Sequence, residues 1–114
     1  MAPIDLGRLR AFSDGTPAGL QQLCGMFLEH MREAADILRP AAAGRNADVL
    51  QAEAHKAAGT AGACGAQRLS ELLTAMELLA AGGQLDEAAA LMHDIDKEVT
   101  LVRQAVQASL ELPR

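Results

Sequence analysis

The sequence predicts an all-α fold, an antiparallel four-helix bundle with a short additional N-terminal helix. Apolar residues recur at the three-and-four spacing of amphipathic helices along most of the chain. No stretch alternates apolar and polar residues in the β-branched context that is typical of a strand. The Gly and Pro breaks are few and leave short connections between long segments, and short connections favour antiparallel neighbours.

The breaks divide the chain into helical segments within one domain, residues 1–114. Asp14 or Thr16 can cap a helix, and Pro17 suits the first turn of the same helix. Later breaks lie around Pro40, Gly44 and Asn46, near Gly65, and at Gly82-Gly83. Asn46 can cap the helix that follows it. We therefore expect a short helix at about 4–12 and a bundle over about 17–110, with long helices at about 17–38, 47–64, 66–81 and 86–110.

Composition argues against several classes of function. The net charge is −5 and no Lys/Arg cluster is present, which argues against binding to nucleic acid or to an anionic membrane surface. No apolar run approaches the ~20 residues that a membrane span needs, and charged residues interrupt the first ten positions, unlike in a signal peptide. We expect a cytoplasmic chain in which Cys24 and Cys64 are small core residues rather than a disulfide.

The third long segment contains the candidate functional residue, His55. At ~100° per residue, its apolar stripe lies roughly 180–260° away from His55, so we expect the imidazole to be exposed. The stripe consists of Leu50, Ala54, Ala57, Ala61 and Cys64.

Two glycines lie beside this histidine on the helical wheel, Gly59 at about 40° and Gly62 at about 20°. Each interior glycine costs roughly 1 kcal/mol of helix stability relative to alanine. Their position indicates that a large partner surface can approach His55. Gln51, Ala52 and Ala58 also place no bulky side chain beside the imidazole. On the wheel alone, two other interpretations remain open, a solvated surface histidine and glycines that bring two helices together. The glycines face away from the apolar stripe, which counts against the second.

The spacing around His55 extends into a longer pattern. A glycine follows the histidine by four residues, at Gly59, and another by ten, at Gly65; a leucine-rich helix then leads to Glu77. This pattern, with the order and lengths of the helices over about 95 residues, resembles the histidine phosphotransfer (HPt) domains of bacterial and fungal phosphorelays.

The resemblance implies a function and a set of roles. His55 would be phosphorylated, Gly59 would leave room for the phosphoryl group and the incoming domain, and Glu77 would orient the imidazole. The chain would carry the phosphoryl group between receiver-domain aspartates, with a response-regulator receiver domain and a hybrid sensor kinase as partners. Mg²⁺ is expected in the receiver domain and no cofactor in this chain. We expect a monomeric phosphocarrier without kinase activity of its own, since no GxxxxGK[ST] nucleotide loop is present.

One position departs from the family pattern. Many members have a lysine three residues after the histidine, where this chain has Ala58, and Lys56 lies about 100° around the helix from His55. The expected partner-docking residues are Gln51, Ala52, Lys56, Ala58, Gly59, Gly62 and Arg68. For Arg68 two interpretations stay open, a contact with an acidic partner surface and an ordinary solvated arginine.

Two alternatives remain. The absent lysine motivates a non-catalytic helical module that binds a receiver domain or a kinase without being phosphorylated. The sequence His93-Asp94-Asp96 motivates a metal-binding bundle. For this second group we expect ordinary surface residues and no metal, because zinc and iron sites need several converging ligands.

Overall fold

The computed structural model describes residues 2–110, and this part of the chain is helical with no strand. The prediction of an all-α bundle with a short N-terminal helix is confirmed. The helices are α1 (Leu6–Phe12), α2 (Pro17–Ala43), α3 (Ala47–Ala63), α4 (Gln67–Ala81) and α5 (Leu85–Leu110).

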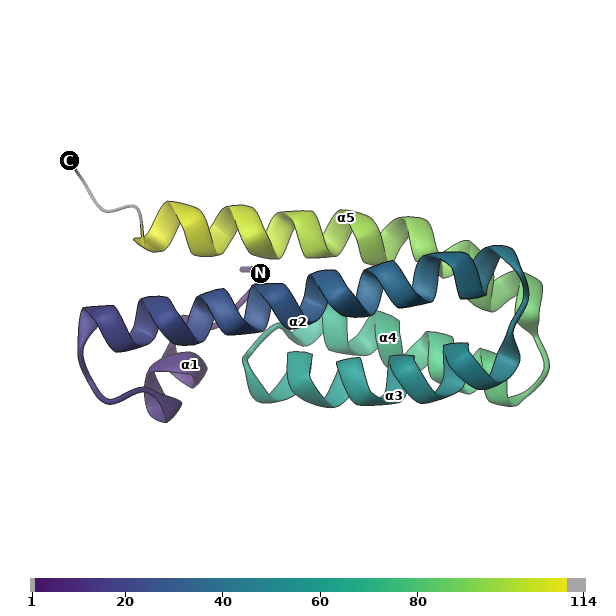
Figure 1. Ribbon diagram of the computed structural model, residues 1–114, viewed down its shortest axis with the longest axis horizontal. Helices are drawn as coiled ribbons and strands as arrows, with labels where there is room; N and C mark the ends of the chain where they lie inside the picture. The colour runs from purple at the N-terminus through teal and green to yellow at the C-terminus, as the bar shows by residue number, and fades with distance from the viewer. Residues whose placement is uncertain (1, 111–114) are drawn as a thin grey trace.

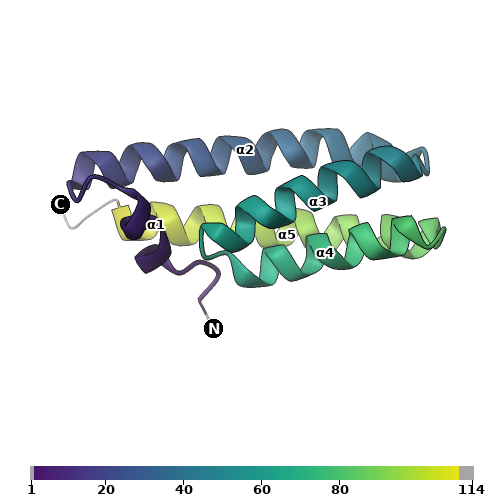
Figure 2. The ribbon, with the colours of Figure 1, turned by 90° about the horizontal axis from the view of Figure 1, so that it is seen from below.

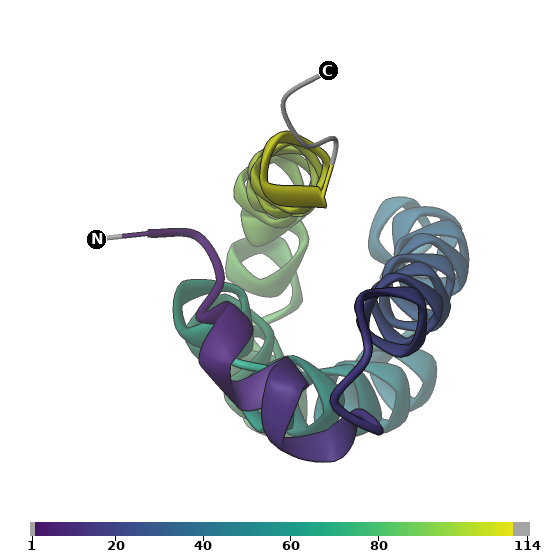
Figure 3. The same cartoon turned by 90° about the vertical axis from the view of Figure 1, so that its left-hand side faces the viewer.

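Helices α2 to α5 form an elongated bundle, and the molecule measures 47 × 23 × 23 Å (Figure 1). Viewed from the end, they form a ring in which each helix packs against two neighbours, in the order α2, α3, α4, α5 (Figure 3). The two longest helices, α2 and α5, extend past one end of the α3–α4 pair. The short α1 lies across that end (Figures 1 and 2).

Side-chain caps fix where three helices begin. Asn46 accepts a hydrogen bond from the Val49 amide at 3.2 Å, as expected. Thr16 is the cap of α2, accepting from the Gly19 amide at 2.9 Å, while Asp14 accepts from the Thr16 hydroxyl at 2.7 Å. That hydroxyl bond lowers the pKa of Asp14. Asp5 caps α1, which therefore begins two residues later than the expected position 4.

The expected end of the second helix near Leu38 is wrong, because α2 continues through Pro40 to Ala43. Proline lacks the amide hydrogen that would bond to the carbonyl one turn earlier, which disfavours a helix interior. Ala41 and Ala42 are nevertheless buried against the core. Packing of this last turn therefore offsets the missing hydrogen bond.

The core is aliphatic, as the stripes predict, and both thiols belong to its interior or its edge. Cys24 is 1% exposed, Cys64 is half-buried, and both are free. Burial raises the pKa of each thiol, which keeps both protonated at neutral pH. The largest fully buried side chains are Leu9, Leu38, Leu50, Leu69, Leu73, Met76, Ile95, Val102 and Val106.

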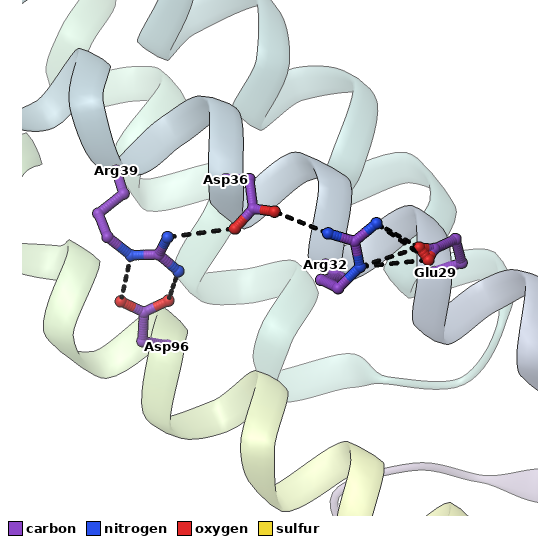
Figure 4. Close-up of polar contacts among 5 residues, drawn as sticks. All are labelled: Glu29, Arg32, Asp36, Arg39 and Asp96. Carbon is purple, nitrogen blue, oxygen red and sulfur yellow. Dashed lines mark hydrogen bonds and ion pairs between the residues drawn. The ribbon is translucent and has the colours of Figure 1, made fainter.

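A row of alternating charges joins α2 to α5 on the side away from α3 and α4 (Figure 4). Along α2 it runs from Glu29 through Arg32 and Asp36 to Arg39, whose guanidinium binds both carboxylate oxygens of Asp96 on α5 at 2.9 and 3.3 Å. These side chains are about half exposed, so solvent screening leaves each pair only a small contribution to stability. The row therefore orients two helices that the apolar core already holds together.

The turn between α3 and α4 is tied to the N-terminal segment at Gly65. Its carbonyl accepts a hydrogen bond from the Asp5 amide at 2.9 Å, and its φ of +88° favours glycine. A Cβ at this position would lie 2.5 Å from the Asp5 carbonyl oxygen. A glycine ten residues after His55 is therefore needed where the N-terminal segment passes against the α3–α4 turn.

Helices α3 and α4 approach closely at Gly62. A Cβ there would lie 3.1 Å from the Ser70 hydroxyl oxygen, and that hydroxyl donates to the Ala58 carbonyl at 2.9 Å. By contrast, a Cβ at Gly59 would meet nothing within 4 Å.

Replacing Gly65 by alanine should destabilise the fold by about 2–3 kcal/mol. The left-handed backbone costs about 1–2 kcal/mol, and displacing Asp5 loses a hydrogen bond worth about 1 kcal/mol. Gly83→Ala is the matched control, because Gly83 has a φ of +78° but open space around its Cβ position. Urea unfolding of both variants measures the difference, and equal losses would contradict the steric role of Gly65.

Replacing the two glycines of α3 should have different effects. Gly59→Ala should raise the free energy of unfolding by about 0.5–1 kcal/mol, because alanine favours a helix interior and the site is open. Gly62→Ala should gain less or lose stability, since Ser70 must move and its bond to Ala58 is weakened. Chemical denaturation compares the two variants, and an equal gain would show that Gly62 has no packing role.

Candidate functional site

His55 lies on the outer face of α3, and its side chain is 76% exposed. The residues expected on the opposite stripe are buried, with Leu50, Ala54 and Ala61 at 0% exposure and Ala57 at 3%. The predicted exposure of His55 is confirmed.

A carboxylate from the neighbouring helix contacts the imidazole. Glu77 on α4 places Oε2 at 2.9 Å from His55 Nδ1. An ionised carboxylate only accepts hydrogen bonds, so Nδ1–H donates and Nε2 keeps its lone pair. The Glu77 side chain is 22% exposed, and the ring is much more open. The contact that the family resemblance implies is therefore present, and it leaves Nε2 as the free nitrogen.

The ring borders a shallow hollow on the surface, lined by Asp48, Gln51, Ala52, His55 and Glu77. The structure thus brings Gln51 and Ala52 to the histidine, as expected. The sequence interpretation missed Asp48, whose signal is its position seven residues, or about two turns, before His55 on the same helix face.

The two glycines near His55 serve different purposes. Gly59 is exposed and open, which fits the predicted access to the ring. Gly62 is half-buried and lets α4 approach through Ser70. The interpretation that both glycines open a docking surface is therefore wrong for Gly62, where close helix packing is the reason for the glycine.

Ala58 is not part of the open surface around His55. It is 7% exposed, and its carbonyl accepts the Ser70 hydroxyl bond. The buried stripe of α3 is wider than expected, because α4 packs against the flank that contains Ala58. Its expected place on the docking surface is corrected accordingly.

The two expected basic docking residues lie away from the hollow. Lys56 is an exposed side chain on the α2 side of α3, with its ammonium 3.4 Å from Glu53. Arg68 lies 3.6 Å from the buried Glu98 of α5. Since Arg68 and Glu77 are nine residues apart on α4, they face opposite sides of that helix. Arg68 therefore contacts α5 and not the surroundings of His55.

Within residues 2–110, no group of three or more His, Cys, Asp or Glu side chains is arranged to hold a metal ion. His93 and Asp94 are exposed, while Asp96 binds Arg39. No helix in this part of the chain is long and apolar enough to cross a membrane.

Comparison with known proteins agrees with this geometry. The model of the Hpt domain family matches residues 22–106, which include α3, α4 and His55. The crystal structure of histidine-containing phosphotransfer protein B (HptB) from Pseudomonas aeruginosa PAO1 has a TM-score of 0.86 to this chain, at 23% identity over 98% of this chain and 97% of that one. At this identity the likeness shows the fold alone. A search of curated proteins found no match. The extent of the family match shows that this chain belongs to the Hpt domain family, the histidine phosphotransfer domains of two-component phosphorelays.

Proposed function

We propose that His55 carries a phosphoryl group between receiver-domain aspartates in a phosphorelay. The main support is the contact of Nδ1 with Glu77 at 2.9 Å on a ring that is 76% exposed. This arrangement combines a nucleophilic nitrogen facing solvent with a carboxylate that holds the proton on the other nitrogen.

In the proposed transfer, the Nε2 lone pair attacks the phosphorus of a receiver aspartyl phosphate. The new N–P bond forms as the bond between phosphorus and the aspartyl oxygen breaks, and the aspartate leaves as a carboxylate. The Nδ1 proton stays on the ring, which becomes positively charged. Glu77 offsets that charge and keeps the ring aimed outward. Transfer to the next receiver reverses the same bonds.

The openness of Gly59 supports the approach of a whole domain to His55, because no side chain of this chain would stand beside the phosphoryl group there. Gln51 and Ala52 extend the same accessible surface. We therefore propose that a receiver domain docks over this face, with the receiver of a hybrid sensor kinase as donor and a response regulator as acceptor. The exchange would take place in the cytoplasm.

Positive charge for the transferring phosphoryl group would come from the partner. Ala58 occupies the place of the usual lysine, Lys56 turns to Glu53, and Arg68 turns to Glu98. Phosphoryl transfer depends mostly on positioning and electrostatic stabilisation. We accordingly propose that the receiver supplies the cationic groups and the Mg²⁺, and that this chain supplies only the oriented imidazole.

Replacing His55 by glutamine should abolish phosphorylation of this chain without unfolding it, because the side chain is exposed. Receiver domains from the same organism, phosphorylated with acetyl phosphate, provide the donor. Acid-labile, base-stable label on the wild type and none on the variant is the expected result. Equal labelling of both proteins would contradict the proposal. A wild type that binds receivers but never acquires label would instead support the non-catalytic module.

Replacing Glu77 should test its role in orienting the ring. Glu77→Ala removes the acceptor for Nδ1–H and should lower the transfer rate about tenfold, as expected for losing a hydrogen bond to a charged group. Glu77→Gln keeps an oxygen acceptor and should retain more of the rate. Single-turnover transfer to one receiver compares the variants, and identical rates for both and the wild type would exclude an orienting role.

A further inference from the structure

Building on the proposed function, we infer that Leu78 and Asp48 select the receiver domain, favouring one whose contact surface has an apolar patch bordered by basic side chains. Asp48 lies beside His55 on α3, and Leu78 lies on the turn of α4 that is level with the histidine. Neither residue takes part in the proposed bond-making step.

Leu78 is a large apolar side chain left in the open. It follows Glu77 directly and is 65% exposed, while the buried face of α4 consists of Leu69, Leu73, Met76 and Ala80. Leu78 lies nine residues after Leu69, which places it about 180° from the core. Because Glu77 reaches His55, the turn of α4 that bears Leu78 lies level with the histidine.

Several exposed residues of α3 around the histidine are small and apolar. Ala52, Gly59 and Ala63 are exposed, and none of them projects far from the helix. Leu78 is therefore an exposed apolar side chain on the turn of α4 that lies level with these small residues. An exposed apolar side chain in this position gains binding energy when a partner covers it and removes it from water.

The charges around this surface are mainly negative. Asp48 lines the hollow beside His55, together with the carboxylate of Glu77. The nearest basic residue on α3, Lys56, is paired with Glu53. A phosphoryl group on His55 would add further negative charge to the same face. A receiver with basic side chains around its apolar contact fits this charge distribution, and opposite charges at a contact rim speed association and exclude wrong partners.

The test uses matched pairs of variants at exposed positions. Leu78→Gln is paired with Met26→Gln on α2, where Met26 is 53% exposed. Asp48→Asn is paired with Asp94→Asn on α5, where the carboxylate is also exposed. Each protein is labelled on His55 with phosphoramidate and mixed with isolated receiver domains from the same organism and Mg²⁺, at a fixed receiver concentration below saturation. Circular dichroism checks that all four variants are folded.

The wild type should transfer fastest to receivers with basic contact surfaces. For these receivers, Leu78→Gln should lower the second-order rate constant about five- to tenfold, and Asp48→Asn about two- to fivefold at low salt. Raising the ionic strength from about 0.01 M to about 0.15 M shortens the screening length from about 30 Å to about 8 Å. It should slow the wild type and reduce the effect of Asp48→Asn. Met26→Gln and Asp94→Asn should match the wild type.

Two outcomes would overturn this inference but not the proposed function. The first is a Leu78→Gln rate equal to that of Met26→Gln. The second is transfer that is insensitive to salt and to Asp48→Asn. In both cases the wild type still passes its label to receivers, so the proposed function stands. If no receiver removes label from the wild type, the proposed function fails, and the inference fails with it.

Discussion

The close approach of α3 and α4 determines the geometry on which the site depends. Alanines form the buried stripe of α3, and Gly62 lets Ser70 reach the Ala58 carbonyl. With larger residues here, α4 would stand further away and Glu77 would not contact His55. The same approach buries Ala58, so one packing arrangement decides both which residue orients the imidazole and which residue is removed from the surface.

The sequence predicts the helices, the aliphatic core, the caps at Thr16 and Asn46 and the exposure of His55, because these follow from local periodicity and capping chemistry. It does not predict the roles of Pro40, Gly62, Ala58 and Arg68, which depend on tertiary neighbours. Pro40 stays helical because the following alanines are buried. Gly62 and Arg68 are explained by Ser70 and Glu98, residues that a wheel of one helix cannot place beside them.

The site also indicates which reacting groups this chain supplies and which its partners would have to supply. The described part of the chain presents one exposed nucleophile held by one carboxylate, while its nearby basic side chains are engaged elsewhere. In the proposed reaction, the stability of the phosphoryl group on His55 would depend on the groups that a docked partner presents to it. Exchange in either direction would then be controlled by the cationic groups of whichever receiver is docked.

The small residues around His55 have a consequence for the speed of this exchange. Ala52, Gly59 and Ala63 have no side-chain rotamers to immobilise, so a partner that covers them loses almost no side-chain entropy on this side of the contact. These three positions need no side-chain rearrangement when a partner covers them. A carrier of this kind can use a small contact that forms without rearrangement and separates quickly, which suits a protein that must leave one partner to reach the next.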